Sequence, residues 1–400
     1  MENKERWIDG FLDRKVKIAG CEMPMISLIF LEIMAFLAFF MRMKLFDIQS
    51  ADYIGFLQPW MDEIRRLGNI KSLAYPISNY PVSYMYIMTL LSYIGGNDLY
   101  FLKFVSVLFD YLAAYAMFLV IITQTKNASK AVFSSVMVLM APMILFDGAY
   151  WCQCDIIYTS FILFAYYKLL KKDSLGVGIF LGLAFCFKLQ TVLILPFFVI
   201  MWLKKKDFNI LHFLCIPIVY VISIIPAWII GRDIKSLLTI YIDQAGYYPW
   251  GTLNYPNIYC LIDENAPKAH YPEQLSGAGM IFAIMLLGVI AYYVYLKKVE
   301  LDYNMMVSIA ILTVGMAVYF MPHMHDRYGF LLDVLAIIYV MLRPKKLPVF
   351  LGFSFVSISC SMPYLIVVEV VPFIWQATIL GGLLVYIGMD LYKQLNKEAQ

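Results

Sequence analysis

MPMISLIFLEIMAFLAFFMRM, residues 23–43, is followed almost at once by FDIQSADYIGFLQPWMDEIRRLGNIKSLAYPISNY, residues 46–80. About 17–25 mostly apolar residues are enough for a helix to cross a bilayer, so the first stretch predicts a membrane-spanning helix. The second stretch mixes carboxylates, aromatic residues and two arginines. It must therefore lie in water or line a wet cavity.

The same pattern of apolar runs continues along all 400 residues. The chain is 62% hydrophobic and 15% charged, whereas charged residues make up about 25% of a soluble domain. This composition excludes a soluble domain and predicts an all-α, polytopic membrane protein, with residues 1–400 as one transmembrane domain. The predicted spans, about twelve, are 23–43, 99–123, 131–147, 155–170, 175–187, 191–203, 210–230, 279–296, 303–321, 328–342, 347–366 and 372–392.

The basic residues predict how the chain is oriented. Twenty of the 31 lysines and arginines fall at alternate turns between spans, and lysine and arginine are enriched in cytoplasmic loops. We therefore expect both termini in the cytoplasm and two long loops, 44–98 and 231–278, outside a bacterial plasma membrane. The basic groups lie within residues 4–17, 126–130, 168–172, 204–206, 297–298, 343–346 and 393–397.

Two short apolar segments need a separate interpretation. Residues 81–94 are too few to span and carry three tyrosines, which favours an interfacial helix on the outer surface. A true span here would move every later basic group to the outside. Residues 175–187 and 191–203 form a short hairpin, which places Lys188 and Gln190 at its outer tip.

With this orientation, the polar residues nearest the spans all fall on the outer side. Ionisable groups at membrane depth are costly and usually face a cavity with partners. The sequence therefore predicts a single polar cavity that opens outward. The residues concerned are Asp47, Asp52, Asp147, Gln153, Asp155, Lys188, Gln190, Asp243, Gln244, Asn254, Asn257, His323, His325, Asp326 and Arg327.

These residue types suit a phosphate-bearing substrate. Lysine, arginine and histidine form charge-assisted bonds to phosphate, and a carboxylate can act as general base. Aromatic side chains of the second outer loop (Tyr247, Tyr248, Trp250 and Tyr255) offer flat faces for sugars. The sequence has no glycine-rich nucleotide-binding loop, and we expect no nucleic-acid partner. A phosphate-carrying substrate met outside the membrane then indicates a lipid phosphate.

No cofactor is expected, because lysine and arginine can meet the phosphate charge, although a divalent metal stays open. Cys152 and Cys154 form a CxC pattern without neighbouring histidines, which is a weak metal signal.

Six segments resemble the polytopic GT-C glycosyltransferases that use polyprenyl-phosphate sugars, in particular the bacterial mannosyltransferase-related proteins. The resemblance covers the chain from Asp52 to about Leu335. The segments are SADYIGFLQPW (50–60), SNYPVSYMYI (78–87), AYWCQCDIIYTSF (149–161), GLAFCFKLQTVLILP (182–196), IDQAGYYPWGTLNYPNIY (242–259) and MPHMHDRYGFLLDVL (321–335).

The resemblance implies inverting transfer of a hexose, mannose or glucose, from a polyprenyl-phosphate donor to a glycan, lipid or protein acceptor at the outer face. It implies Asp52 as the catalytic base and Lys188, Arg327 and His325 as donor-phosphate contacts. The residues that it implies around the substrate are Asp155, Gln153, Gln190, Asn254, Asn257 and Tyr248. In three places the chain departs from the family: Cys152 replaces a usual glycine, PVSY a double-proline form, and Asp326 a glutamate.

Simpler roles are open for several of these residues. Asp52 and Asp155 are each placed to cap a helix, and Asp47 is a second candidate base. Lys188 is able to snorkel as a turn lysine, and Arg327 to pair with Asp326 or Asp333. For the whole chain, the alternatives are a transporter or flippase of lipid-linked sugars and a non-catalytic scaffold. A transporter is expected to have paired halves, whereas these polar residues gather on one side.

Overall fold

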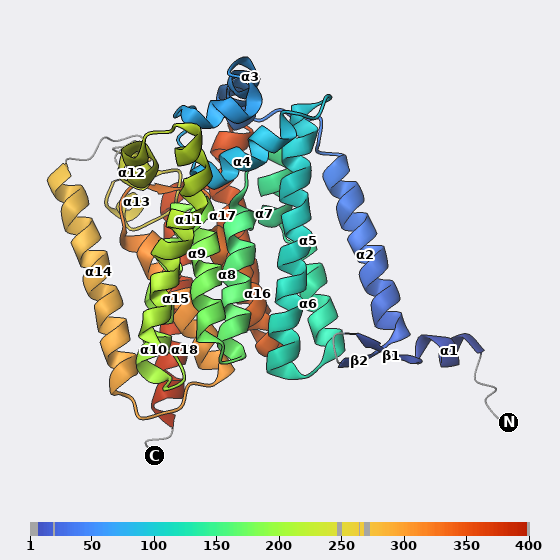
Figure 1. Ribbon diagram of the computed structural model, residues 1–400. Helices are drawn as coiled ribbons and strands as arrows, with labels where there is room; N and C mark the ends of the chain where they lie inside the picture. Colours follow the sequence, from blue (N-terminus) through green and yellow to red (C-terminus); the bar gives the residue numbers. More distant parts are fainter. Residues whose placement is uncertain (1–6, 19–20, 246–249, 264, 268–272, 398–400) are drawn as a thin grey trace.

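The chain folds into an upright bundle of helices with two small pairs of strands (Figure 1). The structure is a computed structural model and describes residues 7–18, 21–245, 250–263, 265–267 and 273–397. The upright helices are α2 (Met25–Met43), α5 (Asp98–Thr125), α6 (Ala128–Met140), α8 (Asp155–Leu170), α9 (Ser174–Phe187), α10 (Leu195–Lys204), α11 (Cys215–Ile230), α14 (Glu273–Leu296), α15 (Tyr303–Phe320), α16 (Phe330–Leu342), α17 (Leu347–Leu365) and α18 (Phe373–Leu395).

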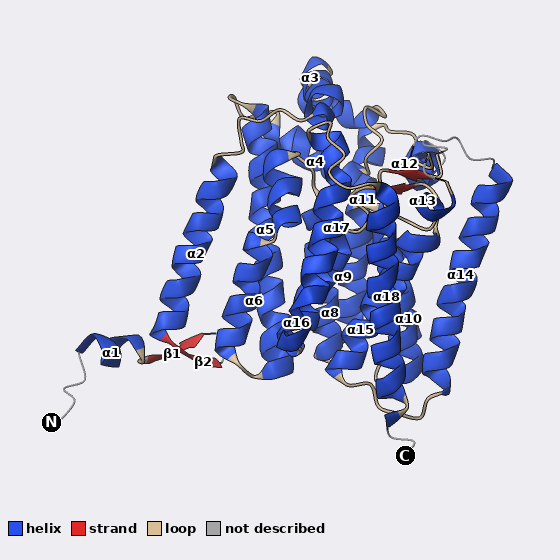
Figure 2. Ribbon diagram, turned by 180° about the vertical axis from the view of Figure 1, so that it is seen from behind, coloured by secondary structure: helices blue, strands red, loops and turns tan. Residues whose placement is uncertain are grey.

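Short elements cover the two ends of this bundle (Figure 2). The antiparallel strands β1 (Lys15–Ile18) and β2 (Cys21–Pro24) lie beside α1 (Trp7–Leu12), and β3 (Thr252–Leu253) pairs in parallel with β4 (Met324–His325). The other short elements are η1 (Tyr53–Leu57), α3 (Gln58–Arg66), η2 (Asn69–Ala74), α4 (Val82–Leu91), α7 (Pro142–Leu145), η3 (Phe146–Tyr150), η4 (Leu189–Ile194), η5 (Ile210–Leu214), α12 (Ile234–Ala245), α13 (Tyr259–Ile262) and η6 (Pro344–Lys346).

The helix composition supports a membrane protein. Seven described helices are long and apolar enough to cross a bilayer, or eight if the bent pair Ala128–Met140 and Pro142–Tyr150 counts as one span. Each of the twelve predicted segments contains a helix, but several of these helices are shorter than a span. The all-α membrane fold is thus confirmed, and the count of twelve spans stays a prediction.

The predicted span 131–147 is a bent pair of helices rather than one continuous helix. The chain bends by 53° between Met140 and Pro142, because proline has no N–H to continue the helical hydrogen bonds and its ring clashes with the preceding turn. After the bend, α7 and η3 carry the chain to Gln153 and Asp155.

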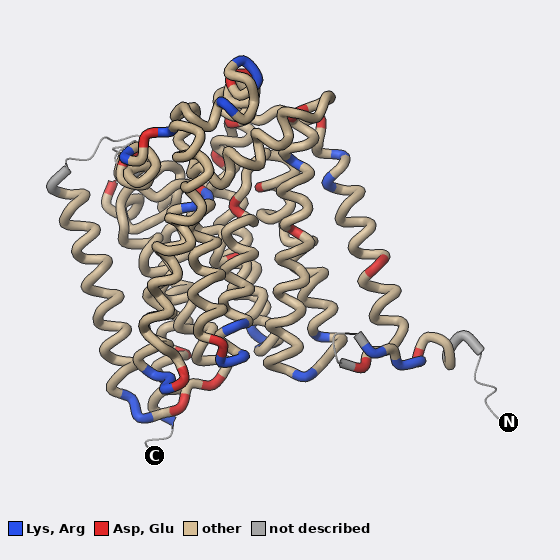
Figure 3. The backbone as a smooth tube through the Cα atoms, in the orientation of Figure 1, with Lys and Arg blue, Asp and Glu red and all other residues tan. Residues whose placement is uncertain are grey.

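The two ends of the bundle differ in charge (Figure 3). The loops α5–α6, α8–α9, α14–α15 and α16–α17 lie at the end where α1 and the C-terminal turn of α18 lie, and most lysines and arginines gather there. We call this the basic end. The elements α3, α4 and α12 lie at the opposite end. Of these, α12 lies within the predicted loop 231–278, where the sequence did not predict a helix.

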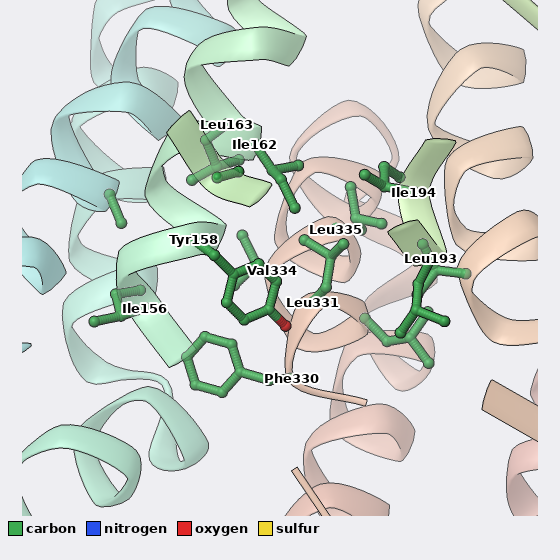
Figure 4. Packing of buried hydrophobic residues seen from close by; sticks show 14 of the residues in the cluster. Ile156, Tyr158, Ile162, Leu163, Leu193, Ile194, Phe330, Leu331, Val334 and Leu335 are labelled. Atoms are coloured by element: carbon green, nitrogen blue, oxygen red, sulfur yellow. The ribbon is translucent and has the colours of Figure 1, made fainter. Parts of the chain in front are cut away.

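A tightly packed core joins α8, η4 and α16 (Figure 4). Tyr158 of α8 lies beside Phe330 of α16, and both side chains are almost fully buried, as is Ile194 of η4. In a close-packed interior, the position of one element constrains the positions of the elements that pack against it. Asp155, Lys188 and Arg327 each lie within three residues of the start of one of these three elements, so the core sets their relative positions.

Candidate active site

A cavity of about 390 Å³ opens at the end of the bundle away from the basic end. Its lining combines carboxylates, cations, amides and aromatic rings from segments far apart in the sequence. Among the described residues, no group of three His, Cys, Asp or Glu side chains is arranged to hold a metal. The lining residues are Asp52, Phe56, Leu57, Trp60, Asn79, Tyr80, Pro81, Trp151, Gln153, Phe187, Lys188, Gln190, Gln244, Leu253, Asn254, His325, Asp326, Arg327, Tyr328 and Tyr364.

Asp52 lies immediately before the π-helical turn η1, in the first polar loop. Its side chain does not cap that helix. Ser50 does so instead, because its hydroxyl accepts a hydrogen bond from the Tyr53 N–H at 3.1 Å and donates to the Trp151 carbonyl at 2.5 Å. Pi-helical turns are often found at functional sites. The capping interpretation of Asp52 is therefore wrong, and its carboxylate is available to the cavity.

Three donors hold the Asp52 carboxylate. Trp151 Nε1 donates to Oδ2 at 2.9 Å, Gln153 Nε2 donates to the same oxygen, and the Tyr364 hydroxyl donates to Oδ1. A carboxylate has about four lone-pair sites. The three bonds leave one of these sites, on Oδ1, for a further donor such as a substrate hydroxyl.

Gln153 connects this carboxylate to the cations. Its amide oxygen accepts from Arg327 Nη1 at 2.5 Å and from the Tyr80 hydroxyl at 2.8 Å, while its amide nitrogen donates to Asp52. These partners fix which way the amide points. The preceding residue, Cys152, has φ +65°, a conformation that glycine adopts without strain. Cysteine therefore occupies a glycine-like turn here.

Two buried cations share one carboxylate. Lys188 Nζ lies 2.9 Å from Asp155 Oδ1, and Arg327 Nη1 lies 3.0 Å from Asp155 Oδ2. Burial, the largest single influence, opposes the charge of Lys188, but the Asp155 carboxylate together with Tyr80 and Cys154 raises the lysine pKa above its ordinary value. Lys188 is only 7% exposed. It is thus a charged group of the cavity rather than a snorkelling turn lysine.

Arg327 also faces the candidate base. Its Nη2 lies 3.7 Å from Asp52 Oδ2, and its guanidinium lies 5.0 Å from the Trp151 ring. Asp326 is a weaker partner at 3.9 Å, and Asp333 is instead hydrogen-bonded to Ser354. Asp155 and Asp52 thus orient the arginine, and its guanidinium is held at the lining of the cavity.

Burial shifts the pKa values of both His325 and Asp326 toward their neutral forms. Burial, with the nearby charge of Arg327, lowers the pKa of His325 to about 3, so its imidazole is uncharged. Burial raises the pKa of Asp326 to about 7. Backbone pairing of β3 with β4 positions this segment, with Asp326 N donating to the Leu253 carbonyl at 2.9 Å. A neutral His325 can still donate one hydrogen bond to a phosphate.

The cavity contains seven of the ten predicted site residues. Asp52, Gln153, Lys188, Gln190, Asn254, His325 and Arg327 line it. Asp155 lies behind the two cations and orients them, so its role is not that of a helix cap. Asn257 is fully buried outside the lining, where its amide bonds the backbone at Tyr259 and Met321. Tyr248 lies outside the described residues.

Two other candidates are placed away from the cavity. Asp47, the second candidate base, is exposed and accepts a hydrogen bond from the Tyr100 hydroxyl. His323 bonds the Trp250 carbonyl through its ring. Neither residue lines the cavity, so Asp52 is the first-loop carboxylate that a bound substrate would meet there.

Several aromatic residues of the site were not predicted from the sequence. Tyr364, at the end of α17, stacks on Trp151 with 5.2 Å between ring centroids and bonds Asp52. Trp60 and Tyr80 pack with centroids 5.4 Å apart at another part of the lining. Trp60 and Tyr80 lie in the first polar loop, whereas in a chain with 16% aromatic residues nothing in the sequence distinguishes Tyr364 from a lipid-facing ring.

Comparisons with known proteins do not assign the chain to a family. No protein-family model matches the sequence, and no curated protein matches it. The resemblance to GT-C glycosyltransferases is therefore carried by the quoted motifs alone, and the site must be interpreted from its geometry.

Proposed function

We propose that the protein is a membrane glycosyltransferase that moves a hexose from a polyprenyl-phosphate donor to an acceptor hydroxyl. One observation carries this proposal: the Asp52 carboxylate has an open acceptor position in the same cavity as the buried cations Lys188 and Arg327. General-base catalysis and phosphate stabilisation need these two kinds of group within one substrate's length. The motif resemblance supplies the substrate class.

The proposed reaction is inverting. The acceptor hydroxyl gives its proton to Asp52 Oδ1 as its oxygen forms a bond to the anomeric carbon. On the opposite face, the bond from that carbon to the phosphate oxygen breaks, and its electron pair leaves with the lipid phosphate. Lys188 and Arg327 stabilise the charge that develops on this phosphate, and neutral His325 and Gln190 can add hydrogen bonds.

The proposed orientation follows from the two ends of the bundle. Because cytoplasmic loops are enriched in lysine and arginine, the basic end is assigned to the cytoplasm and the cavity to the outer face of a bacterial plasma membrane. A polyprenyl-phosphate donor then reaches the cavity from the outer leaflet. The acceptor, a glycan, lipid or protein, reaches it from the water outside.

The direct test is turnover by purified protein in lipid nanodiscs. Polyprenyl-phosphate mannose and polyprenyl-phosphate glucose, each labelled in the sugar, are supplied with a panel of acceptors. We expect covalent transfer by the wild type and a 10²–10⁴-fold loss with Asp52→Asn, because general-base catalysis contributes that range. Near wild-type turnover by Asp52→Asn would exclude Asp52 as the base.

A matched control is Asp47→Asn, which makes the same change in the same loop outside the cavity. It is expected to keep wild-type turnover. Passage of the labelled lipid across a proteoliposome membrane, without any covalent product, would instead support the transporter alternative.

A further inference from the structure

A second, apolar groove lies on the side of the bundle, between α14, α15 and α18. Its volume is about 270 Å³. It has no residue in common with the cavity at the opposite end. The lining residues are Val289, Ile290, Tyr293, Val294, Leu312, Met316, Gly388, Leu391, Tyr392 and Leu395.

The groove lies between three candidate membrane spans. α14, α15 and α18 all meet the length and composition of a bilayer-crossing helix. α14 stands at the edge of the bundle, and only 11% of its apolar window is buried (Figures 1 and 2). Lipid hydrocarbon therefore surrounds this part of the molecule, and lipid is the solvent that can enter the groove.

Water is a poor occupant of this space. A buried water needs two to four polar partners, whereas the lining offers aliphatic side chains and two tyrosines. The Tyr293 hydroxyl is already an acceptor for Asn396 Nδ2 at 2.9 Å. An empty groove would lose van der Waals contacts along all three helices. A hydrocarbon chain needs no polar partners and restores these van der Waals contacts.

One end of the groove carries positive charge. Lys297 Nζ lies 4.8 Å above the Tyr293 ring and donates to Asn396 Oδ1 at 2.6 Å, so neutral groups hold this ammonium at the groove. Lys204 donates to the Lys297 carbonyl, and Lys298 is exposed beside it. Basic pockets between membrane-spanning helices bind anionic lipid headgroups.

We propose that this groove binds one phospholipid with an anionic headgroup. One acyl chain lies along Val294, Leu312 and Leu391, and the headgroup phosphate lies at Lys297 and Lys298. Because hydrocarbon in the groove and in the bulk bilayer is equally apolar, packing and charge must provide the selectivity. The bound lipid packs α14 against α18. This site does not depend on the proposed glycosyltransferase activity.

Two glycines of α18 provide the test. Gly388 lines the groove, and a Cβ added there would meet Leu312 at an ordinary 3.8 Å, so Gly388→Leu starts its side chain without a clash and adds volume to the groove. Gly382→Leu adds the same side chain on the same helix, where nothing lies within 4 Å of the added Cβ. The measurement is native mass spectrometry of the detergent-solubilised protein.

The expected result is one retained phosphatidylglycerol per chain in wild type and Gly382→Leu, and at least a tenfold lower occupancy in Gly388→Leu. Equal lipid retention in all three proteins would overturn the site. Dimers of wild type that are lost only in Gly388→Leu would show a second copy of the chain as the occupant, and would overturn it as well.

The headgroup is tested with Lys297→Gln. Thermal unfolding is followed while phosphatidylglycerol or phosphatidylcholine is added to delipidated protein. The wild type is expected to bind phosphatidylglycerol more tightly, and Lys297→Gln to bind it about fivefold more weakly. Equal stabilisation of the wild type by both lipids would overturn the anionic preference. Sugar transfer is assayed separately, so either proposal can fail alone.

Discussion

Two buried arginines of this protein are held in opposite ways. Arg42 of α2 pairs with Asp110 of α5, with 2.7 Å between Nε and Oδ2, and both side chains are 0% exposed. Arg327 is also largely buried, but it contacts Asp155, Asp52 and Gln153 at the lining of a cavity. The first arginine has one carboxylate partner in a closed contact between helices. The second arginine, Arg327, contacts several partners and lines a cavity.

The difference shows how to interpret charged residues in membrane helices. Intramembrane ionisable groups are functional candidates by default, yet the Arg42–Asp110 pair lines neither of the two cavities described above. Nearby, Lys103 Nζ donates to the carbonyls of Leu45 and Ile48 at 2.8 and 2.6 Å. These charges fasten the end of α2 and the start of the loop that carries Asp52. Both arginines are buried, so burial alone does not distinguish them. Contact with a cavity marks Arg327 as a functional candidate and leaves Arg42 with a structural role.

Breaking the closed pair should have the largest effect on stability. Arg42→Gln leaves the Asp110 carboxylate buried without its cation, which typically costs about 3–5 kcal/mol. We expect a large drop in the midpoint of thermal unfolding, with wild-type turnover per folded molecule.

The paired control is the double variant Arg42→Met, Asp110→Leu, which replaces the ion pair by apolar side chains. It should recover most of the lost stability, because such replacements are often neutral or stabilising. A double variant as unstable as Arg42→Gln would show that shape, and not charge, holds α2 to α5.

The same substitution in the cavity should give the opposite pattern. Arg327→Gln removes a cation from the proposed phosphate site, and loss of one such group costs about 10²–10³ in turnover. Stability should fall less than in Arg42→Gln, because Lys188 still pairs with Asp155 and cavity water can solvate Asp52. Turnover and thermal unfolding of the two variants, measured side by side, decide the comparison. Similar stability losses would show that the Arg327 site is also mainly structural.

Asp326 provides a pH test of the open site. Its folded pKa of about 7 lies above its ordinary value of 3.8, so the folded protein binds this proton more tightly than the unfolded chain does. Its contribution to stability is therefore complete below about pH 4 and is lost as pH rises to about 7. Because asparagine does not titrate, Asp326→Asn removes this loss of stability at higher pH.

Relative to the wild type, Asp326→Asn should gain about 2–3 kcal/mol between pH 5 and pH 8. The measurement is the difference in unfolding midpoint between the two proteins across that range. The opposite titration of His325, whose pKa is lowered, is present in both proteins and cancels from the difference. A difference that does not change with pH would contradict the burial of an ionisable Asp326.

Much of the fold follows from local sequence. Apolar length predicts the helices, and Asn97 and Asp302 begin α5 and α15 by accepting backbone N–H groups, as capping residues do. What local sequence does not contain is which helices pack together. The contact between Arg42 and Asp110 joins residues 68 positions apart, and neither the length nor the composition of a helix predicts it.

The candidate site was predicted by the same kind of reasoning, in part. Polar residues on one side of the spans were expected to line one wet cavity, and Asp52, Lys188 and Arg327 do line one cavity. Asn257 was grouped with them by its loop position and by the motif resemblance, but its amide completes a backbone turn. Tyr364 was missed because it ends an apolar helix that contributes no other residue to the lining. Its role follows from its contact with Asp52 alone.

Tyr364→Phe should have the smallest effect and test the open site most finely. Phenylalanine keeps the stacking on Trp151 and removes the hydrogen bond to Asp52 Oδ1. A hydrogen bond to a charged group contributes about 1.5–3 kcal/mol, so we expect turnover to fall about tenfold. Tyr364→Leu, which also removes the stacking, is the matched control. If Tyr364 only packs against Trp151, Tyr364→Phe will keep wild-type turnover and Tyr364→Leu alone will lose activity.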